Sequence, residues 1–258
     1  MGVEMDGLAR RIWQCRRDGG TLEVPRDGGP SSVEAALAVQ REAVKHSGME
    51  RVGFKVGSTS AEAQKVLGTS EPGASPVLTG FFHESPAKVA IDSSHGPAVE
   101  GEFALRLGRD IPASNSSYSV EEVADAVDAV AGAIEVVGSR FSGGLAGKGR
   151  LLTTADFGAN ISLVVGPWTA DWRGLDLAAH GVELIVDGEL RDSGTGARAL
   201  GHPMNVLQWL SGKWEEGLRA GDIISTGTCT GLVDVAPGTH TVADFGTLGR
   251  VEIEFGAL

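Results

Sequence analysis

Cysteine and basic residues are both scarce in this chain of 258 residues. The two cysteines, Cys15 and Cys229, lie far apart and support neither a disulfide framework nor a Cys-x-x-Cys metal site. Lysine and arginine number 22 against 34 acidic residues, which gives a net charge of −12. Nucleic acids and anionic membranes require a basic surface, so the charge argues against both as partners.

Long apolar stretches are missing as well. No apolar run approaches the roughly 20 residues that cross a bilayer. Residues 1–20 contain no apolar core of signal-peptide length, so we expect a cytoplasmic protein. Aromatic residues make up only 5% of the chain, whereas glycine is abundant at 38 residues. Many glycines indicate turns and close backbone approaches rather than long helices.

The N-terminal part of the chain predicts helices around one short strand. Apolar residues at helical spacing predict helices over residues 7–19, 31–48 and 60–68. Residues 51–57 (RVGFKVG) alternate as a strand does. The segment 69–80 is rich in glycine, proline and serine, so we expect a functional loop there.

Strands dominate from about residue 86 onward. Alternating or β-branched patterns predict them in AKVAID, EFALRLG, NISLVVG, VELIVDG and residues 240–256. A helix is predicted over 119–137, opened by a Ser-x-x-Glu capping box, and another follows Pro203. We therefore predict one α+β domain over 1–258, mainly helical in 1–85, with a β-rich and mostly antiparallel core in 86–258.

Two glutamates, Glu100 and Glu102, stand one residue apart in a predicted strand. Their side chains point to the same face, about 6–7 Å apart at the backbone, and repel unless water or a cation lies between them. Glu135 lies in an apolar stretch, where an unpaired carboxylate is costly and needs a partner. The pattern fits either a solvated strand face or, if the three converge, an all-oxygen site for a hard cation such as Mg²⁺ or Mn²⁺.

Lys55 is the candidate for proton transfer. It lies between two glycines on the polar face of a short strand, where a ligand can approach the backbone closely. A lysine held near a metal in low-dielectric surroundings has a lowered pKa and can perform acid–base work. A surface lysine is the alternative interpretation.

Further polar residues are candidates for substrate contact. The segment STGTCTGL (225–232) can present hydroxyl groups and backbone N–H groups to an anion, although it lacks the Lys-Ser/Thr ending of a P-loop. Within it, Cys229 reads as a small buried residue rather than a nucleophile. The substrate-binding candidates are Ser139, Asp156, Asn160 and Thr228.

Seven segments in order, from FKVGSTS through AQKVLG, VEGEFALRLGRDIP, AIEVVGSRF, LGHPMNVLQWL and LRAGDIISTG to DFGTLGRVEIEF, resemble one family. It is the 2-keto-4-pentenoate hydratase / 4-oxalocrotonate decarboxylase family of the fumarylacetoacetate hydrolase superfamily. The resemblance implies a mixed β-sandwich roll with N-terminal and flanking helices, assembled as a homo-oligomer. It also implies Mg²⁺ or Mn²⁺ held by Glu100, Glu102 and Glu135, with Lys55 and Glu135 as catalytic residues.

The activity implied by the resemblance is hydration of a 2-hydroxy-2,4-dienoate to a 4-hydroxy-2-oxo acid, with a small 2-oxo acid as the partner. Alternatives are a 4-oxalocrotonate-type decarboxylase, a C–C bond hydrolase or tautomerase with His83 as a base, and a non-catalytic partner subunit. The chain departs from the family where the segment 71–78 lacks the usual acidic and aromatic residues, and where Ala159 replaces an aspartate before Asn160. Both departures concern the substrate rather than the metal.

Overall fold

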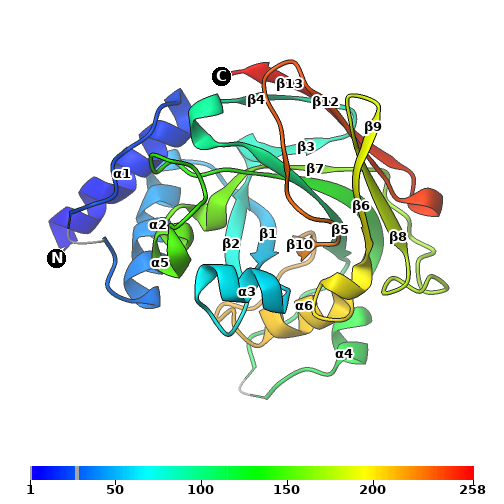
Figure 1. Ribbon diagram of the computed structural model, residues 1–258. Coiled ribbons are helices and arrows are strands. Elements are labelled where there is room, and N and C mark those ends of the chain that lie inside the picture. The colour runs from blue at the N-terminus through cyan, green and yellow to red at the C-terminus, as the bar shows by residue number, and fades with distance from the viewer. Residues whose placement is uncertain (1, 27–28, 115) are drawn as a thin grey trace.

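Two β-sheets and two groups of helices make up the fold (Figure 1). The computed structural model describes residues 2–26, 29–114 and 116–258. The larger sheet has the order β2-β1-β10-β5-β6-β7-β3, with β11 pairing with β5. Its strands are β1 (Arg51–Gly57), β2 (Gly73–Leu78), β3 (Phe82–Glu84), β5 (Ala98–Leu107), β6 (Val127–Val137), β7 (Asn160–Val165), β10 (Ile223–Thr228) and β11 (Val233–Asp234).

The smaller sheet has the order β4-β13-β12-β8-β9. Its strands are β4 (Ala87–Ile91), β8 (Gly181–Val186), β9 (Glu189–Thr195), β12 (His240–Asp244) and β13 (Arg250–Ala257). Most neighbouring strands are antiparallel, whereas β1–β10, β3–β7 and β4–β13 are parallel, so both sheets are mixed. Figure 1 shows the large sheet curving below the small one.

The helices gather at the N-terminal side and at one edge of the large sheet. In Figure 1, α1, α2 and α5 lie at the left, and α3, α4 and α6 lie at the bottom. Their bounds are α1 (Gly2–Asp18), α2 (Val33–Ser47), α3 (Ala61–Leu67), α4 (Val120–Ala124), α5 (Gly149–Ala155) and α6 (Pro203–Ser211). Among the described helices, none combines the length and apolarity needed to span a bilayer.

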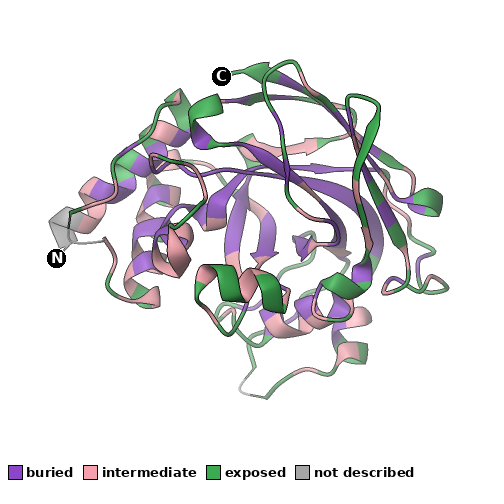
Figure 2. Cartoon of the chain, viewed as in Figure 1, coloured by how far each residue is buried: buried purple, intermediate pink, exposed green. Residues whose placement is uncertain are grey.

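The main hydrophobic core lies between the sheets. Phe103 of β5 packs edge-on against Phe245, which follows β12, with ring centroids 5.5 Å apart. Gly132 of β6 faces the same ring, and a Cβ atom on it would lie 2.2 Å from the Phe245 ring. Figure 2 shows the strands of the large sheet coloured mostly as buried, while the helices have exposed outer faces. A close approach of the two sheets therefore fixes a glycine at position 132.

The predicted helix over 119–137 is wrong beyond its first turns. The capping box is present, with the Ser119 hydroxyl accepting from the Glu122 N–H and the Glu122 carboxylate accepting from the Ser119 N–H. Only α4 is helical, however, and the apolar remainder is strand β6 between β5 and β7. A strand buried on both faces reads as a continuous apolar run, which periodicity does not distinguish from a buried helix.

The expected loop over 69–80 is also partly wrong, because it contains strand β2. This strand pairs antiparallel with β1, and Pro76 lies opposite Phe54. Proline lacks an N–H donor, so it is tolerated in a strand at the edge of a sheet, and β2 is such an edge. Residues rich in glycine and proline therefore concealed a short edge strand.

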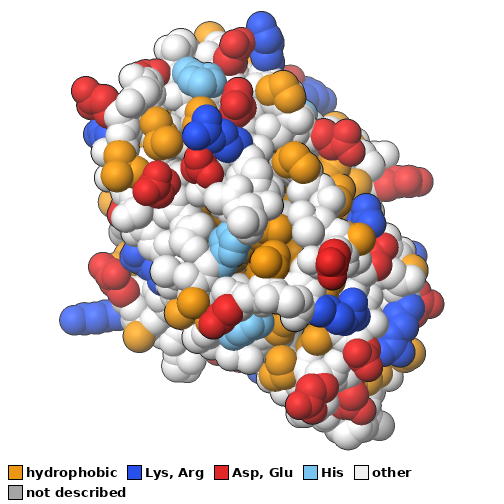
Figure 3. Space-filling view, turned by 90° about the vertical axis from the view of Figure 1, so that its right-hand side faces the viewer, with side chains coloured by type: hydrophobic (Ala, Val, Ile, Leu, Met, Phe, Trp, Pro, Cys, Tyr) orange, Lys and Arg blue, Asp and Glu red, His pale blue; other side chains and the backbone are white. Residues whose placement is uncertain are grey.

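The face of the molecule seen in Figure 3 carries both acidic and basic side chains. Basic side chains do not gather into a large patch on that face, whereas several acidic ones lie together near its lower right. A basic footprint of the kind that nucleic acid requires is absent from this view, in keeping with the net charge of −12.

Candidate metal centre

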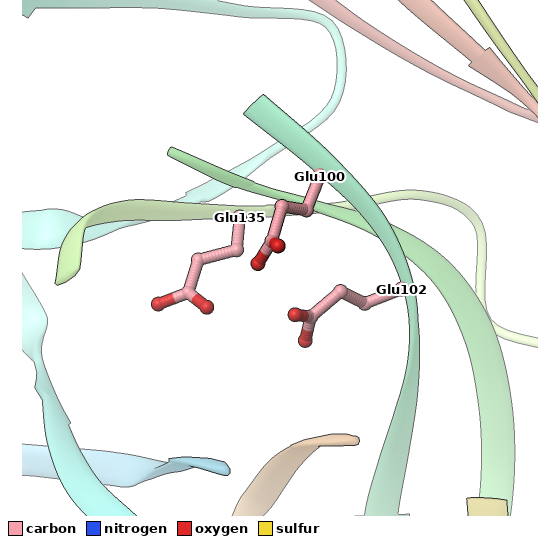
Figure 4. A group of neighbouring side chains, drawn as sticks. All are labelled: Glu100, Glu102 and Glu135. Carbon is pink, nitrogen blue, oxygen red and sulfur yellow. The ribbon is translucent and has the colours of Figure 1, made fainter. Parts of the chain in front are cut away.

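Three glutamates converge from the two central strands of the large sheet. Glu100 of β5 lies directly opposite Glu135 of β6, and Glu102 follows on the same face of β5. Residues opposed in this way have Cβ atoms about 4.5–5.5 Å apart. Carboxylate oxygens of the three residues lie within 4.8 Å of one another, and Figure 4 shows the side chains turning toward a common point.

Burial and mutual repulsion dominate the electrostatics of this cluster. Glu102 and Glu135 are each 1% exposed. Burial raises the pKa of Glu100 to about 7, the Glu135 carboxylate adds to the rise, and Lys55 opposes it. Burial, followed by the charges of Glu135 and Glu100, raises the pKa of Glu102 well above its usual range. The three carboxylates therefore either bind protons or, to stay ionised together, need a positive charge beyond that of Lys55.

Glu102 shows where such a charge fits. Its Oε2 accepts hydrogen bonds from the Ser225 hydroxyl and, at 3.0 Å, from the Gly227 N–H. Its Oε1 is buried and has no hydrogen-bond partner among the described residues. A buried carboxylate oxygen without a hydrogen-bond donor is costly, and coordination of a hard cation would satisfy this oxygen. The residues present thus fit a divalent cation.

The backbone of β10 supports this arrangement through a bulge. The register between β10 and β5 shifts between Ser225 and Thr228. Gly227 within the bulge has φ +87°, and a Cβ atom on it would lie 2.1 Å from the Thr59 hydroxyl oxygen. Only glycine tolerates both the positive φ and the close approach of Thr59. The bulge directs the Gly227 N–H toward Glu102.

Lys55 lies beside the carboxylates on β1. Its Nζ is 3.3 Å from Glu135 Oε1, and the residue is 5% exposed. Parallel pairing of β1 with β10 places Lys55 level with Ser225, one strand away from β5. The lysine is therefore a buried cation at the metal-site end of the cavity, which excludes the surface-lysine interpretation.

Asn160 contacts the same oxygen of Glu135 from the other side. Its Nδ2 donates to Glu135 Oε1 at 2.8 Å, and its Oδ1 accepts from Arg16 of α1 at 2.9 Å. The Arg16 guanidinium is buried between the rings of Phe81 and Phe157, at 4.1 and 4.4 Å. Asn160 is therefore placed behind the carboxylates, linking them to α1.

Asp156 and Ser139 belong to a buried cluster around Arg140, which adjoins Asn160 through a hydrogen bond from Arg140 to the Asn160 carbonyl. Asp156 accepts from the Arg140 backbone N–H at 2.8 Å and forms an ion pair with the Arg140 guanidinium, and both residues are fully buried. The Ser139 hydroxyl is 3.4 Å from Asp156 and also accepts from the Phe141 N–H. This cluster holds the chain between β6 and β7, and in the described structure neither residue lines the cavity.

A cavity of about 460 Å³ opens from the carboxylate cluster. Lys55, Glu100 and Thr228 line it, and Arg198 stands at its wall. His83 lies elsewhere: it is in β3, paired with Val164 of β7, one position away from the row that contains Glu135. Neighbouring positions on a strand point to opposite faces, so His83 faces away from the carboxylates. Cys229 is fully buried, as expected for a small core residue.

Sequence reasoning missed the residues that hold the ligand candidates in place. Ser225 and Gly227 lie in the segment expected to present donors to an anion, and the anion is Glu102 itself. No local sequence pattern indicated the roles of Arg16 and Arg140. Arg16 lies 144 positions from its partner Asn160, and Arg140 lies 16 and 20 positions from its partners Asp156 and Asn160.

The curved mixed sheet gathers three carboxylates and a buried lysine at one end of a cavity, an arrangement that can hold a divalent cation beside a small molecule. Residues 53–257 match the family described as Fumarylacetoacetate (FAA) hydrolase C-terminal, and the chain belongs to this family. Family membership confirms the predicted fold class, a mixed β-roll with flanking helices.

Individual relatives extend the similarity over nearly the whole chain. A 2-keto-4-pentenoate hydratase of Paraburkholderia xenovorans (strain LB400) is 32% identical over 259 residues, covering 98% of this chain and 95% of the relative. A 2-oxo-hept-4-ene-1,7-dioate hydratase of Escherichia coli is 28% identical, with 96% of each chain covered. The structure of 4-oxalocrotonate decarboxylase from Pseudomonas putida G7, complexed with magnesium and adipate, superposes with a TM-score of 0.90 at 25% identity, covering 99% of this chain and 98% of that one.

Proposed function

We propose that the protein is a metal-dependent hydratase that adds water to a 2-hydroxy-2,4-dienoate and releases a 4-hydroxy-2-oxo acid. The hydratases among its relatives support this activity, at up to 32% identity over nearly full length. The observation that carries the proposal is the convergence of Glu100, Glu102 and Glu135, with one buried oxygen of Glu102 left without a donor.

Glu100, Glu102 and Glu135 would hold the cation, and Mg²⁺ or Mn²⁺ suits three carboxylate ligands with positions left for a chelating substrate. The cation supplies Lewis-acid chemistry, which polarises the 2-oxo group and stabilises negative charge on the substrate. Three carboxylates against the single ammonium of Lys55 leave two negative charges, which a divalent ion balances. Among the solved relatives, magnesium accompanies the decarboxylase from P. putida G7.

Lys55 moves the protons. Hydration first moves a proton from the enol hydroxyl to C5, which gives a 2-oxo-3-enoate, and then adds the hydroxyl group of water at C4 and its proton at C3. A group beside the diene that can relay protons and order water suits both steps. Lys55 Nζ lines the cavity and is held by Glu135 Oε1, which leaves its other N–H donors for substrate or water. Thr228 also lies in the cavity wall, where its hydroxyl donates to the Thr230 carbonyl and its oxygen can accept from a substrate hydroxyl or a water.

Decarboxylation of a 2-oxo-3-enedioate is the second candidate, favoured by the structural similarity to the decarboxylase. The same polarised 2-oxo group would accept the electrons released when CO₂ leaves. Hydration and decarboxylation could therefore use the same site, and the identity of the product distinguishes them. A hydrolase that uses His83 as base is less well supported, because His83 faces away from the carboxylates.

The test is an ultraviolet assay with 2-hydroxypenta-2,4-dienoate, with Mg²⁺ and after chelation, followed by mass analysis of the product. We expect Mg²⁺-dependent loss of the dienol and a gain of one water in mass. Glu102→Gln keeps the side-chain volume but removes a ligand charge, and should lower kcat at least about 100-fold. Glu183→Gln, at an exposed strand position of β8, is the matched control and should retain activity. Full activity of Glu102→Gln with unchanged metal dependence would overturn the ligand set.

A further inference from the structure

The cavity is larger than the five-carbon dienoate requires. At about 30 Å³ for each water molecule, a volume of about 460 Å³ corresponds to roughly 15 waters. A 2-hydroxypenta-2,4-dienoate has eight non-hydrogen atoms, by its formula, and its carboxylate end belongs at the metal-site wall formed by Lys55, Glu100 and Thr228. About half of the cavity therefore remains for the other end of the substrate.

Apolar side chains on helices form much of that remaining wall, beside charged ones that include Glu71, Arg150 and Lys213. Val33 and Leu37 come from α2, Val66 and Leu67 from α3, and Trp209 from α6. None of these helices carries a candidate metal ligand. The cavity thus passes from a polar end on the sheet to an apolar end between helices.

The apolar side chains of α3 have little else to pack against. None of the residues of α3 is buried, and Figure 2 shows this helix in the colours of exposed and intermediate residues. Val66 is 79% exposed, and Leu232, on another segment of the cavity wall, is 54% exposed. Apolar groups exposed around a concave site are typical of a ligand-binding groove.

The cations near this wall already have partners. Lys213 Nζ is 2.8 Å from the Glu71 carboxylate, and Arg198 is 3.5 Å from Glu62. Arg150 donates to the backbone carbonyls of Glu71 and Pro72 at 3.0 and 2.8 Å. A second carboxylate at the far end of a substrate would therefore compete with Glu62, Glu71 and two backbone carbonyls for these cations.

We propose that the substrate carries an apolar alkyl or aryl substituent at C5, the end of the diene remote from the carboxylate, and that the wall formed by α2, α3 and Trp209 binds it. This inference rests on the proposed function and names its substrate class. The substituent covers the exposed side chains of α3, and each methylene it buries strengthens binding by a factor of about four.

The test compares 2-hydroxy-2,4-dienoates that bear hydrogen, propyl, phenyl or a carboxyethyl group at C5. With the Mg²⁺-loaded protein, propyl and phenyl should raise kcat/KM at least about tenfold over hydrogen, and carboxyethyl should not. Leu67→Gln places an amide in the apolar wall and should lower kcat/KM for the propyl and phenyl substrates much more than for the unsubstituted one, which removes this preference. Leu190→Gln, at an exposed position of β9 outside the cavity, should keep the preference.

A binding measurement separates failure of the tail proposal from failure of the hydratase proposal. By calorimetry with Mg²⁺-loaded protein, 2-oxooctanoate should bind at least about tenfold tighter than pyruvate, and 2-oxoadipate should not. The same order of affinities without any dienoate turnover would support the apolar site and reject the hydratase. Equal affinities, the tightest binding by 2-oxoadipate, or a preference that survives Leu67→Gln would overturn the apolar site.

Discussion

At the scale of single residues, the orientation of one amide decides how the carboxylate cluster is arranged. A guanidinium has donors and no acceptor, so Arg16 fixes Asn160 with its oxygen toward α1 and its NH₂ toward Glu135. Glu135 Oε1 then accepts from Asn160 and faces Lys55 Nζ at 3.3 Å. With Oε1 occupied, the second oxygen of Glu135 is the one left for a cation.

Arg16 is therefore predicted to position the metal ligand without touching the metal. Residues that hydrogen-bond a metal ligand typically change metal affinity 10- to 100-fold, and Arg16 acts one contact further out, through Asn160. Arg16→Met should therefore weaken Mn²⁺ binding by about the lower end of that range, roughly tenfold. Manganese titration followed by electron paramagnetic resonance measures it. Arg17→Met, at an exposed neighbouring position, should bind Mn²⁺ normally, and Arg16→Lys should recover part of the loss. A lower melting temperature for Arg16→Met with unchanged Mn²⁺ affinity would reduce Arg16 to a purely structural role.

At the scale of secondary-structure elements, β6 controls how closely the two sheets approach. Gly132→Ala adds a methyl group that would lie 2.2 Å from the Phe245 ring, so the ring or the strand must move. Overpacking of this kind costs about 1–3 kcal/mol of the free energy of unfolding. Urea unfolding followed by circular dichroism measures the loss. Gly181→Ala on β8, where the same Cβ meets nothing within 4 Å, should be close to neutral, and equal effects of the two would contradict this packing argument.

The elements also show what could be predicted from the sequence. Glu100 and Glu102 could be assigned to one face because the side chains of a strand alternate with period two. The apolar run of β6 could not be assigned, because one of its faces is buried by the other sheet, for example at Gly132 against Phe245, and that sheet is distant in sequence. The interaction of Arg16 with Asn160 joins α1 to β7 across 144 positions, and no local pattern encodes such a contact.

At the scale of the whole molecule, the fold buries three glutamates in one place, although burial disfavours the ionised form of a carboxyl group. The net charge of −12 already repels further negative charge, and three carboxylates share one buried space. In the metal-free protein the pKa of Glu100 is raised from 4.5 to about 7, and that of Glu102 is raised as well. The native state therefore binds more protons than the unfolded state between pH 4.5 and pH 7.

This difference sets the sign of the pH dependence. Stability rises with pH only where the unfolded state binds more protons, so here the glutamates cause the free energy of unfolding of the metal-free protein to fall from pH 4.5 to pH 7. A cation needs the deprotonated carboxylates, so its stabilising effect grows across the same window. Melting temperatures with chelator and with saturating Mg²⁺ should therefore diverge as the pH rises.

Glu100→Gln is the variant that isolates the cause, since it removes one titrating group from the cluster without adding charge. It should flatten the pH dependence of the chelated protein in this window and reduce the rise in melting temperature on adding Mg²⁺. Glu254→Gln, an exposed glutamate of β13 paired with Lys88, should change neither. An Mg²⁺-induced rise of equal size at pH 4.5 and pH 7 would mean that the cation binds elsewhere. Because the buried carboxylates weaken the empty fold and strengthen the loaded one, the same three residues would couple folding of the whole molecule to possession of its metal.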